Sequence, residues 1–473
     1  MVFSSLIFIF AFLPVTLALY YLVPFRAKNV VLLLCSLVFY AWGEPVYVVL
    51  MILNIAFNYV AGLDISMNAD NLKRKRAALI LCMVFDLGLL GFFKYAGFVV
   101  DNINALFGCD IPFRAVGLPV GISFYTFQVM SYIIDVYKGE IKAQKNPLTL
   151  GVYVTMFPQL IAGPIVQYSD VEKQLAQRVI SRELFSSGVS RFIVGLSKKV
   201  ILANSAGSLF DTISALETGD MSVLTGWLLA ASYTFQIYFD FSGYSDMAIG
   251  LGKMLGFDFK ENFNYPYMSK SASEFWRRWH ISLSSWFRDY VYIPLGGSYV
   301  EKKKHIRNIM VVWMLTGLWH GASWTFIIWG LYYGVLLIFE KYFLLKIISE
   351  DSRGIKGAFL HIYTIVVFVV GWVIFSSPDM HAAGKIISVM FGFGASSLID
   401  GTGMYYLQAN ALLGAIMILG STSYVKSFAQ RFMFVFKDSA AYRAAACVMT
   451  VFLLISVAYL VNETYNPFLY FRF

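Results

Sequence analysis

Charged side chains are scarce in this sequence. Only 14% of its 473 residues are Asp, Glu, Lys or Arg, whereas 59% are hydrophobic and the mean hydropathy is +0.66. About a quarter of the residues of a soluble domain are charged, and these residues form its wetted surface. A chain of this size without such a surface needs the bilayer as part of its solvent. A soluble globular fold is therefore excluded.

Cysteines are also few. The four cysteines lie far apart in the sequence, and three of them are in apolar segments. The sequence contains no CxxC, HExxH or GxSxG motif, and no histidine is followed by an Asp in an HxxxxD pattern. The spacing suggests neither a zinc site nor a disulfide framework, and we expect no metal and no bound cofactor.

The apolar residues are grouped in blocks. Five stretches have no Asp, Glu, Lys or Arg and about the length of a membrane span: 1–25, 45–63, 308–339, 357–378 and 444–462. Shorter or interrupted apolar blocks lie at 29–43, 77–98, 118–137, 150–166, 185–204 and 222–250. The blocks are too long and too evenly apolar for barrel strands, so they predict an all-α polytopic membrane protein. We expect about ten to twelve membrane segments, with residues 1–25 as a retained first helix because a basic signal-peptide start is missing.

The net charge of +9 is carried largely by what we predict to be loops. Basic residues cluster at 26–28, 73–76, 138–145, 198–199, 302–304 and 341–353, whereas the predicted loops 99–111 and 205–221 are acidic or neutral. This asymmetry is the positive-inside pattern, which assigns the basic loops to the cytoplasm and leaves no need for a nucleic-acid partner. We find no internal repeat and expect no charged residues within the spans, which argues against a transporter.

The middle of the chain departs from this pattern. Residues 252–308 are rich in charge and tryptophan although they lie between apolar blocks, which predicts short amphipathic or re-entrant helices on the cytoplasmic side. Segment 150–166 contains two prolines and should form a broken helix, which is tolerated at membrane depth only where protein or water covers it. No linker divides the chain, so we expect one membrane domain over residues 1–473.

One histidine lies deep in an apolar block. His320 is within the uncharged run 308–339, and a straight helix from Arg307 would put it roughly 20 Å away from that charge. Ionisable groups at such depth usually serve function, and an imidazole can accept a proton from a hydroxyl at neutral pH. The flanking Gly317 and Gly321 permit close backbone approach or a helix break, and Trp319 and Trp324 could wall a pocket. The alternative is a neutral core histidine bonded to a neighbouring helix.

A second histidine has charged neighbours. His280 lies in the segment FWRRWHISLSSWFRDY, which also contains Arg277, Arg278, Arg288 and Asp289. Either this segment is an interfacial helix anchored by its tryptophans, or it is a support site in which paired arginines bind the phosphates of a coenzyme A donor.

Other polar residues leave their roles open. Asp240 and Asp246 near the end of an apolar block could pair structurally or line a pocket. His305 and His381 are in predicted loops and should be solvated, and His361 begins an apolar span.

Long stretches of the chain resemble the membrane-bound O-acyltransferase family, in particular its bacterial alginate O-acetyltransferase branch. They are LPVGISFYTFQVMSYIIDVY from Leu118, MFPQLIAGPI from Met156, FDFSGYSDMAIGLGKMLGFDF from Phe239, SASEFWRRWHISLSSWFRDYVYIPLGG from Ser271, RNIMVVWMLTGLWHGASWTFIIWG from Arg307, and the tail NPFLYFRF.

The resemblance implies a ring of about ten to twelve transmembrane and re-entrant helices around a central funnel. It implies that His320, in the motif Trp319-His320-Gly321, is the catalytic general base in the helices of 308–340, with His280 in support. We expect the substrate-binding residues to be Arg277, Arg278, Trp279, Trp319, Arg288 and Asp289.

The resemblance also implies an activity and a location. A cytoplasmic acyl thioester, acetyl-CoA, would supply an acetyl group for an extracytoplasmic polysaccharide such as alginate. The location would be the cytoplasmic membrane of a bacterium, with a hydrolase-like acetyltransferase or the glycan itself as acceptor. The alternatives are transfer of D-alanyl or another acyl group to teichoic acid or peptidoglycan, a transporter, and a structural scaffold for a polysaccharide synthase.

Overall fold

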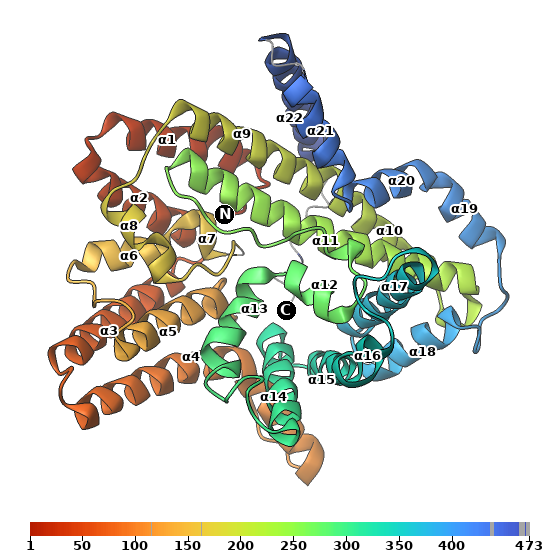
Figure 1. The fold of residues 1–473 in the computed structure, drawn as a ribbon, viewed down its shortest axis with the longest axis horizontal. Helices are drawn as coiled ribbons and strands as arrows, with labels where there is room; N and C mark the ends of the chain where they lie inside the picture. The colour runs from red at the N-terminus through yellow and green to blue at the C-terminus, as the bar shows by residue number, and fades with distance from the viewer. Residues whose placement is uncertain (115, 162, 436–438, 463–468, 470–473) are drawn as a thin grey trace. The chain divides into compact units, whose positions relative to one another are not determined.

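A computed structural model of the protein describes residues 1–114, 116–161, 163–435, 439–462 and 469. Within these ranges the chain is helical and has no strand, which confirms the predicted all-α class. The chain forms two compact units, residues 1–192 with 244–260 and residues 193–243 with 261–473. Helices α9 and α11 each contribute residues to both units (Figure 1). The expectation of one domain over 1–473 stays a prediction.

The first unit is built from the N-terminal helices. They are α1 (Leu13–Leu22), α2 (Phe25–Ala41), α3 (Tyr47–Met67), α4 (Leu72–Phe107), α5 (Ile122–Lys138), α6 (Pro147–Thr155), α7 (Phe157–Leu160), α8 (Tyr168–Ala176), the first part of α9 (Arg182–Ser197) and the last part of α11 (Val223–Met254). Helices α3, α4 and α5 pack against one another, and almost every residue of α5 is buried. The unit therefore has α5 in its core.

The second unit contains the segments that the sequence singled out for chemistry. Its helices are α10 (Asn204–Ser214), the first part of α11, α12 (Ala272–Arg278), α13 (Ile281–Phe287), α14 (Lys302–His320), α15 (Trp324–Phe339), α16 (Leu345–Ile347), α17 (Gly354–Ser376), α18 (Met380–Met390), α19 (Gly401–Ala409), α20 (Ala411–Gly420), α21 (Tyr424–Val435) and α22 (Ser439–Asn462). The predicted short helices within 252–308 are present as α12 and α13.

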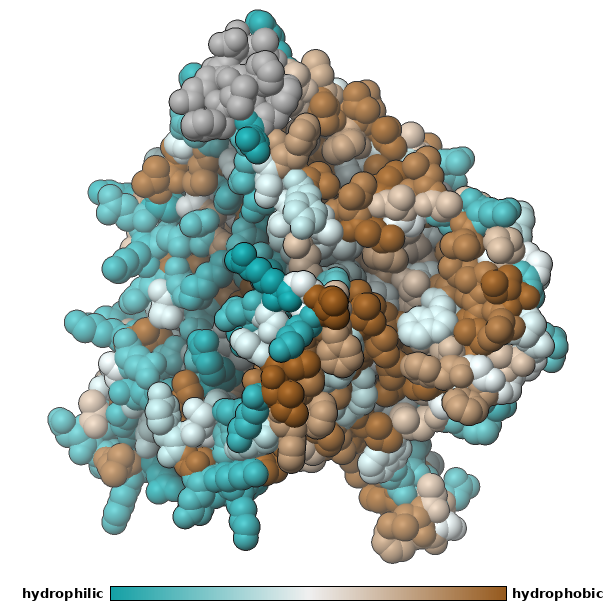
Figure 2. All heavy atoms as spheres, turned by 45° about the vertical axis from the view of Figure 1, so that its right-hand side comes forward, coloured by the Kyte–Doolittle hydropathy of each residue, from teal (hydrophilic) through white to brown (hydrophobic). Residues whose placement is uncertain are grey.

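Five helices among the described residues are long and apolar enough to cross a membrane, or up to six if the bent pair α19 and α20 is one span. Figure 2 shows large patches of apolar side chains on one part of the face drawn, beside a largely hydrophilic part. Many such side chains are exposed to the surroundings, for example Leu22 at 82% and Leu106 at 77%. A soluble protein rarely exposes so many large apolar side chains, so the chain is a membrane protein. The count of ten to twelve segments stays a prediction.

Several sequence-based boundaries need correction. Residues 99–107 are the last turns of α4 and residues 204–214 form α10, so these predicted loops are largely helical. The apolar start of the chain forms a shorter helix than predicted, Phe8–Leu22. Segment 150–166 is broken as expected, because α6 ends at Thr155 and α7 covers only four residues. The tail NPFLYFRF, except Leu469, lies outside the described residues.

The expectation that the spans carry no charged residues is wrong. Asp86 lies within the membrane-length helix α4 and is fully buried. One of its oxygens accepts hydrogen bonds from the amide nitrogens of Asn54 and Asn58, at 2.6 and 3.0 Å. Because the two asparagines are four residues apart in α3, they share one helix face. Polar side chains of this kind join neighbouring helices within a bilayer.

Helices α9 and α11 approach so closely that glycine is required. A Cβ on Gly188 would lie 2.6 Å from the carbonyl oxygen of Gly250, and a Cβ on Gly250 would lie 2.6 Å from that of Gly188. Small residues let membrane helices pack backbone to backbone. Beside this crossing Arg191 of α9 pairs with Asp246 of α11 at 2.7 Å, so Asp246 pairs structurally.

A buried ion pair lies in the second unit. Lys199 Nζ is 2.7 Å from Asp240 Oδ1, and both side chains are only 2% exposed. The other Asp240 oxygen accepts the backbone N–H of Leu469 at 2.9 Å. The prediction of a basic loop at 198–199 is therefore wrong for Lys199, whose charge is neutralised inside the protein. Asp240, like Asp246, has the structural role that the sequence left open.

Removing one partner of this ion pair should destabilise the protein strongly. We expect Lys199→Met to lower the free energy of unfolding by about 3–5 kcal/mol, because it leaves a buried carboxylate without its cation. The measurement is thermal unfolding in detergent. Lys199→Met combined with Asp240→Asn should recover part of this loss, and a double variant that is no more stable than Lys199→Met would contradict the interpretation.

Candidate active site

The position of His320 is set by a close crossing of α14 and α15. A Cβ on Gly317 would lie 2.3 Å from the carbonyl oxygen of Phe326, and a Cβ on Gly330 would lie 2.2 Å from that of Trp313. Any larger residue at either site would force the helices apart. Helix α14 then ends at His320 because Gly321 adopts an extended conformation. The flanking glycines thus provide both the close approach and the helix break that the sequence suggested.

Aromatic rings enclose His320. The rings of Trp319, Trp329 and Phe375 pack on it in T-shaped contacts, with centroids 5.1, 5.1 and 5.3 Å away. Phe375 belongs to α17, so three helices contribute to this shell. The His320 side chain is only 7% exposed. An imidazole in such surroundings is shielded from water.

His280 lies at a tight turn between α12 and α13. Its backbone is left-handed, with φ +44°, one of only two such non-glycine residues in the described part of the chain. This conformation is costly for a residue with a side chain and is found preferentially at functional sites. The ring is buried against Phe241 at 4.7 Å and lies 6.0 Å from the ring of Trp319. Trp319 therefore contacts both His280 and His320.

Hydrogen bonds fix the tautomer of His280. The side-chain oxygen of Asn262 accepts the backbone N–H of Ser282 at 3.1 Å, which identifies that atom as oxygen rather than nitrogen. His280 Nδ1 is 3.2 Å from the same oxygen, so Nδ1 carries the proton and donates it. Nε2 then keeps its lone pair, and within the described residues it has no hydrogen-bond partner. Burial lowers the pKa of His280 to about 3, so the ring is neutral at physiological pH.

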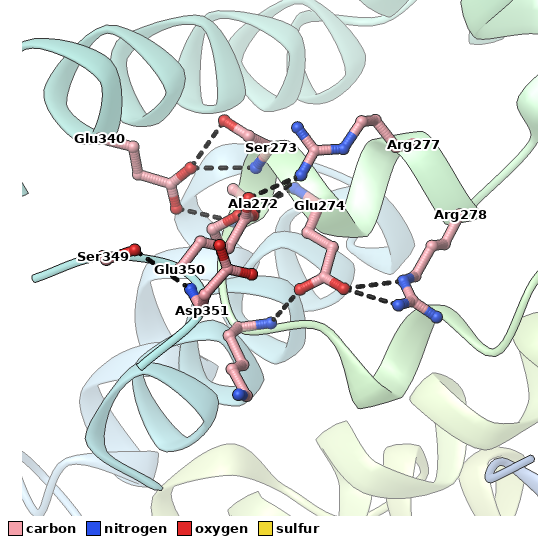
Figure 3. Close-up of polar contacts among 11 residues, drawn as sticks. Ala272, Ser273, Glu274, Arg277, Arg278, Glu340, Ser349, Glu350 and Asp351 are labelled. Atoms are coloured by element: carbon pink, nitrogen blue, oxygen red, sulfur yellow. Dashed lines mark hydrogen bonds and ion pairs between the residues drawn. The ribbon is translucent and has the colours of Figure 1, made fainter. Parts of the chain in front are cut away.

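Helix α12, which leads to His280, begins on a buried carboxylate (Figure 3). Glu340, at the end of α15, accepts the backbone N–H groups of Ala272 and Ser273 at 2.6 and 2.9 Å and the hydroxyl of Ser273 at 2.9 Å. A carboxylate at this end of a helix satisfies free N–H groups and complements the helix dipole. Glu340 is fully buried. It therefore ties the start of α12 to the helix that packs on α14.

The arginines around His280 are already paired with carboxylates. Arg277 contacts both oxygens of Glu350 at 2.9 and 2.8 Å, and Arg278 contacts Glu274 at 2.7 Å (Figure 3). Arg288 pairs with its neighbour Asp289 at 2.7 Å. Arg277 and Arg288 remain about 60% exposed, at 62% and 60%. A phosphate would have to compete with these carboxylates, and the role of the three arginines in binding substrate stays a prediction.

The tryptophans of this segment are core residues rather than interfacial anchors. Trp276 packs against Trp313 of α14 at 4.8 Å and Tyr333 of α15 at 4.9 Å. Trp279 is 2% exposed and packs on Trp372 at 4.8 Å. Trp276 and Trp279 therefore do not anchor an interfacial helix, and a direct contact of Trp279 with substrate stays a prediction.

His305 was expected to be solvated, which is wrong. It is 3% exposed, and its two ring nitrogens lie 2.8 Å from the hydroxyl of Tyr292 and 2.6 Å from that of Tyr342. His361 is half-buried and bonds the carbonyl of Ser269 at 3.0 Å, whereas His381 is exposed as predicted.

Sequence reasoning missed several residues that shape this site. They are Asn262, Glu340, Trp329 and Phe375. Glu340 had a signal, because it is the first charged residue after the run 308–339. Asn262 had none, since a loop asparagine carries no periodicity, and Phe375 is one of 43 phenylalanines.

Comparison with known proteins gives a consistent picture. The sequence profile of the MBOAT, membrane-bound O-acyltransferase family matches residues 140–347. A probable alginate O-acetylase of Azotobacter vinelandii is 45% identical over 85% of this chain and 80% of its own length. A peptidoglycan O-acetyltransferase of Helicobacter pylori is 36% identical over 84% and 81%. A teichoic acid D-alanyltransferase of Bacillus subtilis is 32% identical over 53% and 69%.

The chain therefore belongs to the membrane-bound O-acyltransferase family. It is an enzyme, an O-acyltransferase of the membrane, and the transporter and scaffold alternatives are removed.

Loss of the group that fixes the His280 tautomer should impair catalysis. We expect Asn262→Ala to lower kcat about tenfold to a hundredfold with a smaller change in KM, the range seen when an orienting partner of a histidine is removed. Ser282→Ala is the comparison variant, because it removes the hydroxyl that donates to Asn262 at 2.9 Å and lies 3.5 Å from Nδ1, while the contact of Asn262 with Nδ1 stays. Asn262→Asp should keep an acceptor at Nδ1 and shift the acid limb of the pH–rate profile. Equal activity of Asn262→Ala and Ser282→Ala would contradict the orienting role.

Proposed function

We propose that this enzyme transfers an acetyl group from cytoplasmic acetyl-CoA, through the membrane, to the hydroxyl of an extracytoplasmic acceptor. The observation that carries the proposal is His320, an imidazole at the end of a helix, enclosed by aromatic rings and shielded from water. The family supplies the reaction class, O-acyl transfer, and this site offers one base suited to it. No metal or bound cofactor is needed for the step.

In the proposed step, an imidazole nitrogen of His320 accepts the proton of the attacking hydroxyl. The hydroxyl oxygen forms a bond to the thioester carbonyl carbon, the carbon–sulfur bond breaks, and the thiolate takes up the proton. Trp329 packs on His320, and among the described residues its indole N–H has no hydrogen-bond acceptor. A buried donor beside the base is suited to stabilise the negative charge that develops on the carbonyl oxygen. His280 supports this arrangement through Trp319, which contacts both histidines.

The aromatic shell favours acetyl over longer acyl groups. Phe375 packs on His320 at 5.3 Å, and Phe326 packs on Phe375 at 4.8 Å. Both side chains are buried, at 3% and 8% exposure. A longer acyl chain attached to a carbonyl beside His320 would have to displace one of these rings, whereas a single methyl group adds little volume.

The relatives support a polysaccharide as the acceptor. The 45% identical protein is named an alginate O-acetylase, and the match covers most of both chains. We therefore propose O-acetylation of alginate or a related exopolysaccharide, with acetyl passed to a hydrolase-like acetyltransferase outside the membrane or directly to the glycan. The location would be the cytoplasmic membrane of a bacterium.

Peptidoglycan is the second candidate acceptor, because a peptidoglycan O-acetyltransferase is 36% identical over a similar share of the chain. D-Alanyl transfer to teichoic acid is less favoured, since that relative matches only 53% of the chain.

Removal of the proposed base should abolish acetyl transfer. We expect His320→Ala to lower thiol release from radiolabelled acetyl-CoA at least a hundredfold, because one general base contributes about 10² to 10⁴ in rate. His381→Ala, at an exposed histidine, is the control and should retain activity. Unchanged thiol release from folded, purified His320→Ala would refute the assignment. The fate of the label identifies the acceptor as the protein, a partner or a glycan.

Shortening Phe375 should relax the choice of acyl group. We expect Phe375→Ala to raise the ratio of kcat/KM for butyryl-CoA to that for acetyl-CoA about tenfold, since each methylene in an apolar pocket contributes about 1–3 kcal/mol to discrimination. Phe368→Ala is the matched control, because Phe368 lies seven residues earlier in α17 and packs on Tyr267 and Phe275. Both variants create a cavity, but only the first borders His320. A ratio that stays at the wild-type value in Phe375→Ala would count against a steric limit at this ring.

A further inference from the structure

Two buried cations in the first unit play no part in the proposed chemistry. One is Arg178, which follows α8 and is 7% exposed. Its Nε donates to the hydroxyl of Tyr20 at 2.6 Å, and one terminal nitrogen donates to the side chain of Asn29 at 2.8 Å. The other terminal nitrogen, Nη2, is buried and has no hydrogen-bond partner in the described part of the chain. Two N–H bonds of a buried guanidinium are therefore unused.

The second cation is Lys28, near the start of α2, which is also 7% exposed. Its ammonium group donates to the backbone carbonyl of Tyr20 at 2.5 Å. An ammonium has three N–H bonds, so this contact uses only one of them. Lys28 Nζ and Arg178 Cζ lie 4.4 and 5.4 Å from the centroid of the same Tyr20 ring. The two positive charges are therefore neighbours.

No carboxylate among the described residues balances these charges. Within the ranges that the structure describes, neither Lys28 nor Arg178 forms an ion pair. Among the acids nearby in sequence, Asp170 pairs with Lys260, Glu183 and Asp258 are exposed, and half-buried Glu172 forms no ion pair with either cation. Two like charges held together away from water repel each other and lack their hydration, so burial of charge normally requires a partner of opposite sign. The unused donors and the uncompensated charge of +2 both call for an anion.

We propose that Lys28 and Arg178 form a binding site for a phosphate group. A guanidinium matches the geometry of phosphate oxygens, and an ammonium adds a point charge. A carboxylate anion would satisfy the charge less fully, because phosphate offers more acceptor oxygens to the unused N–H groups. The aromatic rings of Tyr20, Phe25 and Phe257 around the two cations keep competing water away.

The surroundings of this site indicate where the phosphate comes from. The turn between α1 and α2 exposes Leu22 at 82% and Phe25 at 40%. Exposed apolar side chains of a membrane protein face lipid, and tyrosine with basic residues is typical of the headgroup level. Basic pockets between membrane helices on the cytoplasmic side bind anionic lipid headgroups. A phospholipid headgroup is therefore within reach, and a soluble source, the phosphates of coenzyme A, is the other possibility that the experiment separates.

The test measures thermal unfolding of the purified full-length protein in a neutral, phosphate-free detergent, titrated with phosphatidylglycerol, with coenzyme A or with inorganic pyrophosphate. We expect the wild type to be stabilised by phosphatidylglycerol and the apparent affinity to fall about tenfold or more in Lys28→Met and in Arg178→Gln, since each removes a charge-assisted contact. Arg26→Gln is the matched control, because Arg26 belongs to the same basic cluster but is exposed. It should bind as the wild type does.

A second prediction distinguishes a loss of phosphate binding from a loss of folding. Without an anion, Lys28→Met should be at least as stable as the wild type, because it relieves the repulsion from Arg178. Arg178→Lys should keep part of the binding that Arg178→Gln loses. A response to phosphatidylglycerol alone supports a lipid phosphate, and a response to coenzyme A or pyrophosphate that depends on the two residues supports a soluble phosphate. The proposal is overturned if no probe stabilises the wild type, or if both charge-removing variants respond like Arg26→Gln. These measurements follow thermal unfolding and not acyl transfer, so their result is independent of whether His320 is the catalytic base.

Discussion

The contact of α14 with α15 governs the geometry of the active site. At Gly317 and Gly330 the two backbones are so close that a Cβ atom would lie 2.3 or 2.2 Å from a carbonyl oxygen of the facing helix. This closeness sets the axis along which α14 delivers His320, and it brings Trp329 onto the imidazole ring. The same pair of helices receives Trp276 from α12 and, through Glu340, the first N–H groups of that helix. These contacts therefore fix the position of the turn that holds His280 relative to the helix that holds His320.

Three buried carboxylates in the described part of the chain follow one rule, which is that each is matched locally. Glu340 is matched by backbone N–H groups, Asp86 by two asparagines and Asp240 by Lys199. The bilayer enforces this rule because it offers no water to solvate an unmatched group. Lys28 and Arg178 stand out against that background, since their like charges are adjacent and no acid among the described residues pairs with them. This exception is what we expect of a site whose negative charge comes from a bound ligand, as proposed for Lys28 and Arg178.

Composition and apolar blocks were sufficient to predict an all-helical membrane protein and the break near Pro158, and the glycines beside His320 indicated a close backbone approach or a helix break there. These features depend on local sequence, on runs of apolar residues and on glycine or proline. The pairing of Lys199 with Asp240 and the burial of His305 were not predictable, because they depend on which helices become neighbours. Asn262 illustrates the limit best. Its role rests on the orientation of one amide towards a ring 18 residues away, which no local pattern encodes.

The contact between Asp240 and Leu469 has a consequence for how the protein is made. Leu469 is 229 residues downstream of Asp240, so it does not yet exist when α11 leaves the ribosome. Lys199 precedes Asp240 and is available at that moment, which lets the ion pair neutralise the carboxylate during insertion. The second oxygen of Asp240 obtains its backbone partner only after the intervening helices have been synthesised. The ion pair can therefore form before the hydrogen bond from Leu469, which can be made only after the last part of the chain has been synthesised.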